Sequence, residues 1–233
     1  RTPRSPTAPS PTITTVFPSV ALAVPFGKIS LFTGLFAERE GRVTLADTGS
    51  YPGSIYDATY RRETSIHSVP VMVSGLAGSR LVLSAGMLFS FLDMREESIV
   101  DFRSDEFTDT DDIMDTYASG EGFAAAFVVD LDRVKLGGLF RTGPHLSGSL
   151  DRSNRPIGVW SSQAVDISTK DAFRFGLRAE PVAAVAIEAD YDQDPWAGLK
   201  LDGKALNKTT ADRWSLGIQY RGDYLWQASK YPI

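Results

Sequence analysis

Strict alternation of apolar and polar residues is the feature that most constrains the fold of this chain. In residues 173–177 every second residue is apolar, and Arg174 and Arg178 fall on the opposite parity. The same pattern recurs in residues 183–191, 214–221, 134–141, 81–91 and 68–74. Side chains of a β-strand point alternately to its two faces, so this period predicts strands with one apolar face. Almost no segment has the period of an amphipathic helix.

Short turns rich in Gly, Pro and Asp join the predicted strands in pairs, because these residues supply the dihedral angles of tight turns. The turns lie near residues 25–27, 77–79, 130–132, 179–181 and 222–223. Between the pairs lie long polar connections at about 39–64, 93–120, 142–170 and 192–212. We therefore expect a single meander of about eleven antiparallel strands in which short and long connections alternate.

A long antiparallel meander can form either a soluble β-sandwich or a barrel that spans a membrane. In the membrane barrel the apolar faces contact lipid and the polar faces line the lumen, with short periplasmic turns and long extracellular loops. The polar faces here mix Gly, Ala and Ser with charges of both signs, which suits a closed interior because Gly weakens a water-exposed strand. The pattern favours an all-β, antiparallel up-and-down transmembrane β-barrel, with the soluble β-sandwich binding module as the alternative.

The composition agrees with this fold and argues against several other functions. The formal charge of −5 argues against a nucleic-acid partner, which needs a basic protein face. Cysteine is absent, so disulfides, thiolate zinc sites and iron–sulfur clusters are excluded, and we expect no cofactor. The chain has two histidines, His67 and His145, and no Gly-x-Ser-x-Gly sequence, so we do not expect an enzyme.

The chain divides into a short lead-in and one large domain. Residues 1–12 contain four prolines and are expected to be extended. Residues 13–233 are expected to form a single β-barrel domain that is incomplete, with both ends of the protein cut.

The hairpin over 173–191 resembles the repeated hairpins of FadL-like outer-membrane transport proteins, which carry long-chain fatty acids or aromatic hydrocarbons. The similarity includes Asp190, Tyr191 and Trp196, and the segments 122–143 and 212–221 resemble the family in the same way. The family's N-terminal hatch, with its Asn-Pro-Ala sequence, is not in this chain, and about eleven strands are fewer than the fourteen of the family.

The resemblance implies a channel in the bacterial outer membrane that passively admits small hydrophobic or amphipathic molecules. Its expected partners are such a substrate, outer-membrane lipid and lipopolysaccharide. The alternative within the same fold is a structural or ligand-binding barrel that acts through its extracellular loops.

Charged residues on the polar faces are the candidates for the substrate path. Arg174 and Arg178 share one face of a strand, and Glu188 and Asp190 share the same face of its hairpin partner. Either these residues form a charge ladder that stabilises the wall, or they select an anionic head group. The candidate lumen residues are Arg174, Arg178, Glu188, Asp190, Lys135, Arg141 and Gln219.

Acidic residues are concentrated in residues 93–121, which contain eleven carboxylates and two arginines. Clustered carboxylates can bind Ca²⁺ or Mg²⁺, or bridge lipopolysaccharide through such ions. A solvated extracellular loop that its charge keeps soluble is the simpler interpretation. The weak candidates for metal ligands are Asp109, Asp111, Asp112 and Asp115.

Overall fold

The structure is a computed structural model that describes residues 20–51, 54–155, 157–182, 184–205 and 212–220. The proline-rich lead-in over 1–12 and the turn expected at 222–223 lie outside these residues. No helix of the described part is long and apolar enough to cross a membrane.

Nearly all of the described chain is β-strand, and the longest strands have 22 to 24 residues. The elements are β1 (Val20–Phe26), β2 (Ile29–Tyr51), β3 (Ser54–Ala77), β4 (Leu81–Phe102), β5 (Thr110–Leu131), β6 (Val134–Arg141), β7 (His145–Asn154), β8 (Val159–Ser168), β9 (Ala172–Val182), β10 (Val185–Gln193), the 3₁₀ helix η1 (Pro195–Gly198), β11 (Lys200–Leu201), β12 (Lys204–Ala205) and β13 (Asp212–Tyr220). Eleven of these strands have seven or more residues, in agreement with the expected number.

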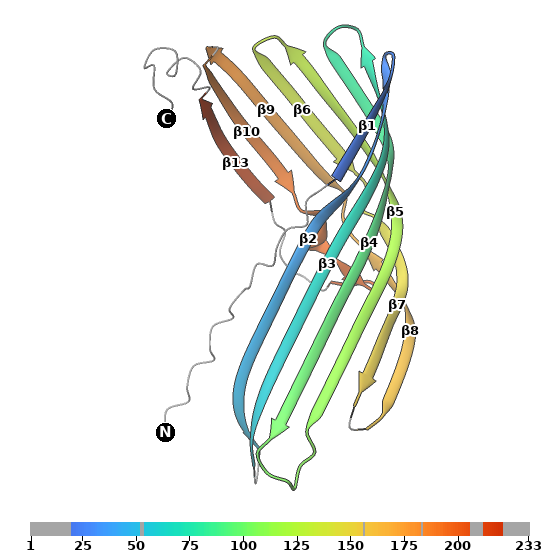
Figure 1. Ribbon diagram of the computed structural model, residues 1–233, viewed down its shortest axis with the longest axis vertical. Helices are drawn as coiled ribbons and strands as arrows, with labels where there is room; N and C mark the ends of the chain where they lie inside the picture. Colours follow the sequence, from blue (N-terminus) through green and yellow to red (C-terminus); the bar gives the residue numbers. More distant parts are fainter. Residues whose placement is uncertain (1–19, 52–53, 156, 183, 206–211, 221–233) are drawn as a thin grey trace.

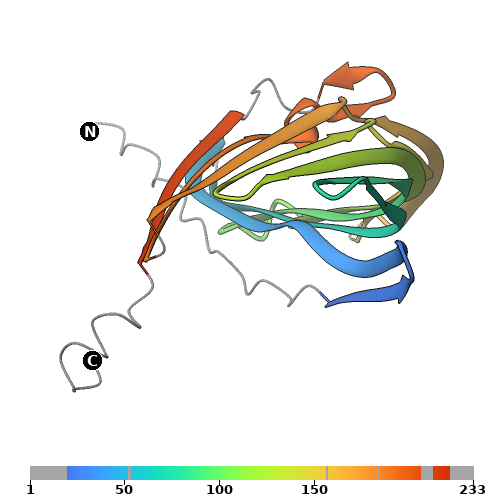
Figure 2. The same cartoon turned by 90° about the horizontal axis from the view of Figure 1, so that it is seen from above.

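All described strands belong to one antiparallel sheet, and from β1 to β6 each strand pairs with the next (Figure 1). The main path runs β1-β2-β3-β4-β5-β6-β9-β10-β13, while β7 continues β6 along β5 and pairs with β8. Seen from above, the sheet curls around a concave side (Figure 2). The described strands do not close it, because β1 and β13 remain its two edges. The predicted all-β up-and-down fold is confirmed. The described strands form a single curled sheet and not the two packed sheets of the alternative β-sandwich.

The long polar connections differ from expectation, since most of their residues are in strands. β2 and β3 fill most of 39–64, β4 and β5 fill most of 93–120, and β7 and β8 fill most of 142–170. The prediction of loops was wrong because the polar residues of these segments pair with polar residues on the neighbouring strands. Arg61 and Arg62, for example, form ion pairs with Glu97 and Glu96, each at 3.2 Å. Strands that look like loops in the sequence therefore extend the sheet beyond its apolar part.

The turn expected at 179–181 is also wrong, because β9 continues to Val182. The backbone N–H of Glu180 donates to the carbonyl of Arg133 at 2.7 Å, and its side chain accepts from Arg178. These interactions keep the segment in the sheet despite Pro181.

Apolar side chains are exposed on the convex face of the sheet and buried on the concave face. On β4 the outward side chains are between 37% and 49% exposed: Leu83, Met87, Phe89 and Phe91. The inward Leu88, Ser90 and Leu92 between them are buried. Phe173, Phe175 and Leu177 on β9 are similarly exposed, at 42% to 50%. The convex face therefore has the polarity of a surface that contacts lipid.

Candidate functional site

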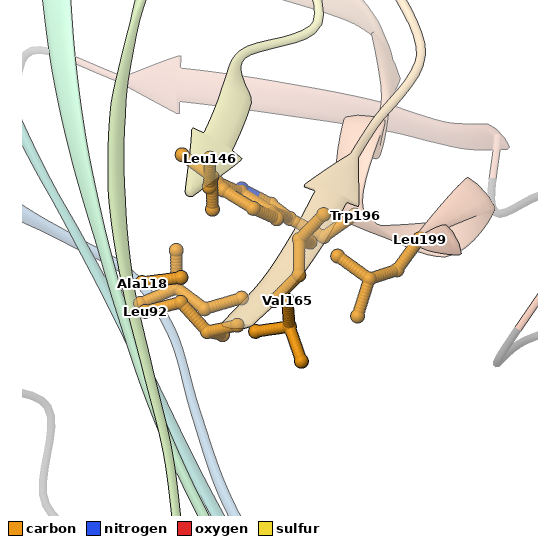
Figure 3. Close-up of a cluster of buried hydrophobic side chains, with 8 residues drawn as sticks. Leu92, Ala118, Leu146, Val165, Trp196 and Leu199 are labelled. Carbon is orange, nitrogen blue, oxygen red and sulfur yellow. The ribbon is translucent and has the colours of Figure 1, made fainter. Parts of the chain in front are cut away.

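A packed apolar layer lies on the concave side of the sheet, about halfway along its long strands (Figure 3). Its side chains come from β3, β4, β5, β7, β8 and the segment from η1 to β11. The buried members are Ile66, Leu92, Ala118, Leu146, Val165, Ile167, Trp196 and Leu199. Leu150 and Leu201 pack against this cluster. We call this set the apolar layer.

Trp196 is placed in the apolar layer by the short 3₁₀ helix η1. Asp194 caps this helix by accepting a hydrogen bond from the backbone N–H of Trp196 at 2.9 Å, and proline occupies its first turn. After η1, Lys200 and Leu201 of β11 pair with β8 and tie the segment to the wall. The indole is therefore held from both sides and is 2% exposed.

Glu38 lies beside the apolar layer at an irregularity in β2. The pairing of β2 with β3 shifts by one residue between Ala37 and Arg39, so Glu38 is the extra residue of a β-bulge. Arg141 Nη1 donates to Glu38 Oε1 at 2.6 Å, and Trp196 Nε1 donates to Glu38 Oε2. The bulge thus directs a carboxylate toward a cation and an indole that are far away in the sequence.

The Glu38–Arg141 ion pair spans the concave side, because β2 and β6 are separated in the sheet by β3, β4 and β5. The two side chains are 12% and 17% exposed. The Ser68 hydroxyl lies beside the same carboxylate and contacts Ser90 Oγ at 3.2 Å. A buried charge must be paired and hydrogen-bonded, and both oxygens of Glu38 meet this condition. The apolar layer and this ion pair form the candidate functional site.

Arg174 and Arg178, predicted on the polar face of their strand, do meet carboxylates of the next strand. Arg178 stands opposite Glu188 in the register and donates to it, and also to Glu180 at 2.9 Å. Arg174 makes a two-fold contact with Asp192, at 3.0 and 2.9 Å, rather than with Asp190. The cross-strand charge ladder is present, but with a shifted set of partners.

The other candidate lumen residues are more scattered. Lys135 stands opposite Arg178 in the sheet but pairs with Asp130 at 3.0 Å. Asp190 accepts a hydrogen bond from Ser215 at 3.3 Å. Gln219 is exposed on β13, opposite Ala186. Of the seven candidates, only Arg141 belongs to the buried site, and sequence reasoning missed its partner Glu38.

Each of the four candidate metal ligands in the acidic stretch lies next to a nitrogen of the protein. Asp112 accepts two hydrogen bonds from Arg152, at 3.1 and 2.6 Å, and these hydrogen bonds hold the pKa of Asp112 below its usual range. Asp111 and Asp115 each lie 3.8 Å from an arginine, and Asp109 accepts from the backbone N–H of Phe102. Within the part of the chain that the structure describes, no group of three or more His, Asp or Glu residues is placed to hold a metal ion.

Comparison with known proteins finds similarity among solved structures. No protein-family model and no curated protein matches the chain. Among solved structures, the toluene transporter TbuX of Ralstonia pickettii is similar, with a TM-score of 0.57 and 11% sequence identity. The match covers 86% of this chain but 64% of the TbuX chain, so the chain spans less than two thirds of that length. At this identity the similarity shows a common fold.

Proposed function

We propose that this protein is part of the wall of an outer-membrane β-barrel channel that passively admits small hydrophobic or amphipathic molecules. The observation that carries the proposal is the reversed polarity of the sheet, with large apolar side chains exposed on the convex face. On β4 this apolar face runs from Leu81 to Phe91, ten residue steps. At about 3.3 Å per residue and a tilt of about 40°, it spans roughly 25 Å, the height of the apolar band in outer-membrane barrels.

The orientation of the wall follows from the two kinds of connection. Short turns at Gly27, Gly78 and Asp132 have positive φ values and lie at the end where the apolar band begins. At the other end the strands continue as long charged hairpins. In outer-membrane barrels short turns face the periplasm and long excursions face outward, so we place the charged hairpins outside, where they would contact lipopolysaccharide.

The concave side supports a hydrophobic cargo better than a water-filled pore. A water-filled pore needs a polar lining along its whole length, whereas here an apolar layer interrupts it. The fold shared with a toluene transporter is consistent with this proposal. The mechanism needs no covalent chemistry, because the molecule is captured at the hairpins and passes the apolar layer when side chains there move.

The purified protein, reconstituted in phospholipid vesicles, tests the proposal. We expect it to speed the entry of a small neutral aromatic probe, relative to protein-free vesicles, while a sugar of similar size enters no faster. Equal rates with and without protein would refute the transport function. A monodisperse monomer in buffer without detergent would refute the membrane assignment as well.

A second candidate function is a barrel that acts through its outer hairpins. The observation in its favour is the length of β2 to β5, which continue well past the apolar band with ion pairs on both faces. Such a protein would insert into vesicles without speeding the entry of any probe, so the same experiment separates the two functions.

A further inference from the structure

We infer that Glu38 sets the charge selectivity of the passage by neutralising Arg141, so that neutral apolar molecules are admitted and carboxylates are disfavoured. The inference rests on the proposed channel function and specifies its substrate class. It starts from the position of the Glu38–Arg141 ion pair, which spans the concave side next to the apolar layer.

Arg141 is the most buried cation among those predicted to line the lumen. Its side chain is 17% exposed, compared with 59% for Arg174, 49% for Lys135 and 27% for Arg178. A charge that water screens poorly acts strongly on a passing ion. An uncompensated Arg141 would therefore attract a carboxylate into the apolar part of the path.

Glu38 removes that attraction without presenting its own charge. One carboxylate oxygen accepts from Arg141 and the other from the Trp196 indole, so both oxygens are occupied. The pair is neutral as a unit, and Glu38 joins it through Trp196 to an apolar layer that includes Ile66, Leu92 and Leu146. A molecule at this level meets apolar surface and a satisfied ion pair, which offers an anionic head group nothing to replace its lost hydration.

The other inward charges do not mask this effect. Arg174 pairs with Asp192, Arg178 with Glu180 and Glu188, and Lys135 with Asp130. Asp190 lies on the same face, hydrogen-bonded to Ser215. Each of these cations is already compensated, so removal of the Glu38 charge leaves Arg141 as the one cation whose partner is lost.

The test compares Glu38→Gln with the unmodified protein in vesicles, using benzyl alcohol and benzoate as neutral and anionic probes of similar size. Gln keeps an oxygen for the indole and removes the charge. We expect the ratio of benzoate to benzyl alcohol entry to rise about tenfold or more, because a partly buried charge is little screened. Entry of benzyl alcohol should change much less.

Two further variants fix the sign of the effect. Arg141→Gln leaves the carboxylate unpaired and should raise the entry of benzylammonium instead of benzoate. In the double variant Glu38→Gln/Arg141→Gln, the entry of benzoate and of benzylammonium, each relative to benzyl alcohol, should return close to the values of the unmodified protein. Glu97→Gln removes a carboxylate that pairs with Arg61 in the charged hairpins, away from the apolar layer, and is the matched control, with unchanged ratios expected.

The inference is supported if Glu38→Gln favours benzoate and Arg141→Gln favours benzylammonium. It is overturned if the relative entry of the charged probes is unchanged in both single variants. If Glu38→Gln does not fold, as judged by its heat-dependent mobility on gels, Arg141→Gln and the double variant still decide. If the unmodified protein passes none of the probes, the channel proposal itself fails, which is a different result from unchanged ratios.

Discussion

Replacing Met87 by Arg tests the membrane assignment at the centre of the apolar band. Met87 points outward from β4, is 39% exposed, and stands between Val71 and Phe123 on the neighbouring strands. It lies six residues from Leu81 and four from Phe91, the two ends of the band. With about 3.3 Å per residue and a tilt of about 40°, it is roughly 10 Å deeper in the bilayer than Phe91.

The expected cost follows from this depth. Arg on the lipid face costs about 2–4 kcal/mol at the bilayer midplane and about 0–1 kcal/mol near the interface. We therefore expect Met87→Arg to lower the free energy of unfolding by about 2–4 kcal/mol and Phe91→Arg to lower it by about 1 kcal/mol or less. If this face met water, a half-exposed Met could become Arg at a cost within about 0.5 kcal/mol.

The assay is reversible urea unfolding of the protein inserted in phospholipid vesicles, followed by tryptophan fluorescence. Phe91→Arg is the matched control, because it introduces the same side chain on the same face of the same strand. A Met87→Arg variant that is no less stable than Phe91→Arg would refute the placement of this band in the bilayer.

Three further predictions concern packing, the apolar layer and pH. Gly120→Val should destabilise the sheet by about 1–3 kcal/mol or more, because a Cβ there would overlap a carbonyl oxygen of β7, whereas Gly137→Ala, whose nearest atom would be 3.8 Å away, should be tolerated in the same urea assay. Leu146→Ala, at a fully buried site, should cost about 2–5 kcal/mol of unfolding free energy and speed the entry of neutral probes into vesicles. Arg152→Gln should increase hydrogen exchange only slightly at pH 7 where β5 pairs with β7, because the ion pair between Arg152 and Asp112 is exposed to water. Because the pKa of Asp112 is lowered in the folded state, its contribution is present above the ordinary carboxyl pKa of about 3.9 and should be lost as the pH falls through the lower folded value.

The sequence predicts the apolar half of each strand well, because apolar and polar residues alternate strictly there. Leu83, Met87 and Phe91 have the same parity and all point outward, as expected. It predicts the charged half poorly, because a run such as 93–102 has charged residues on both parities and looks like a loop. Only the register shows that several of these charges stand opposite a charge of the other sign, as Arg95 does with Glu63 and Asp115.

The candidate site could be predicted only in part. Parity alone places Arg141 on the inner face. Its partner Glu38 comes from β2, which three strands separate from β6 in the sheet, and alternation within a strand carries no information about contacts across the concave side. The bulge is equally hidden, because Val43 and Leu45 keep the odd numbering of Leu31 and Leu35 although they follow the shift.

The bulge at Glu38 connects the membrane boundary to the selectivity of the path. Before the bulge, the side chains of Leu35 and Ala37 on β2 point outward. After the bulge, the side chain of Glu40 points outward, because its carboxylate lies 3.7 Å from the outward-facing His67. On β4 the same change occurs between Phe91 and Asp93 without a bulge, and Phe91 pairs with His67 at the level of Ala37. The apolar layer and the Glu38–Arg141 pair therefore lie where the convex face changes from apolar to charged. A molecule that arrives along the charged hairpins would meet the apolar layer and a neutral ion pair at the level where it enters the membrane.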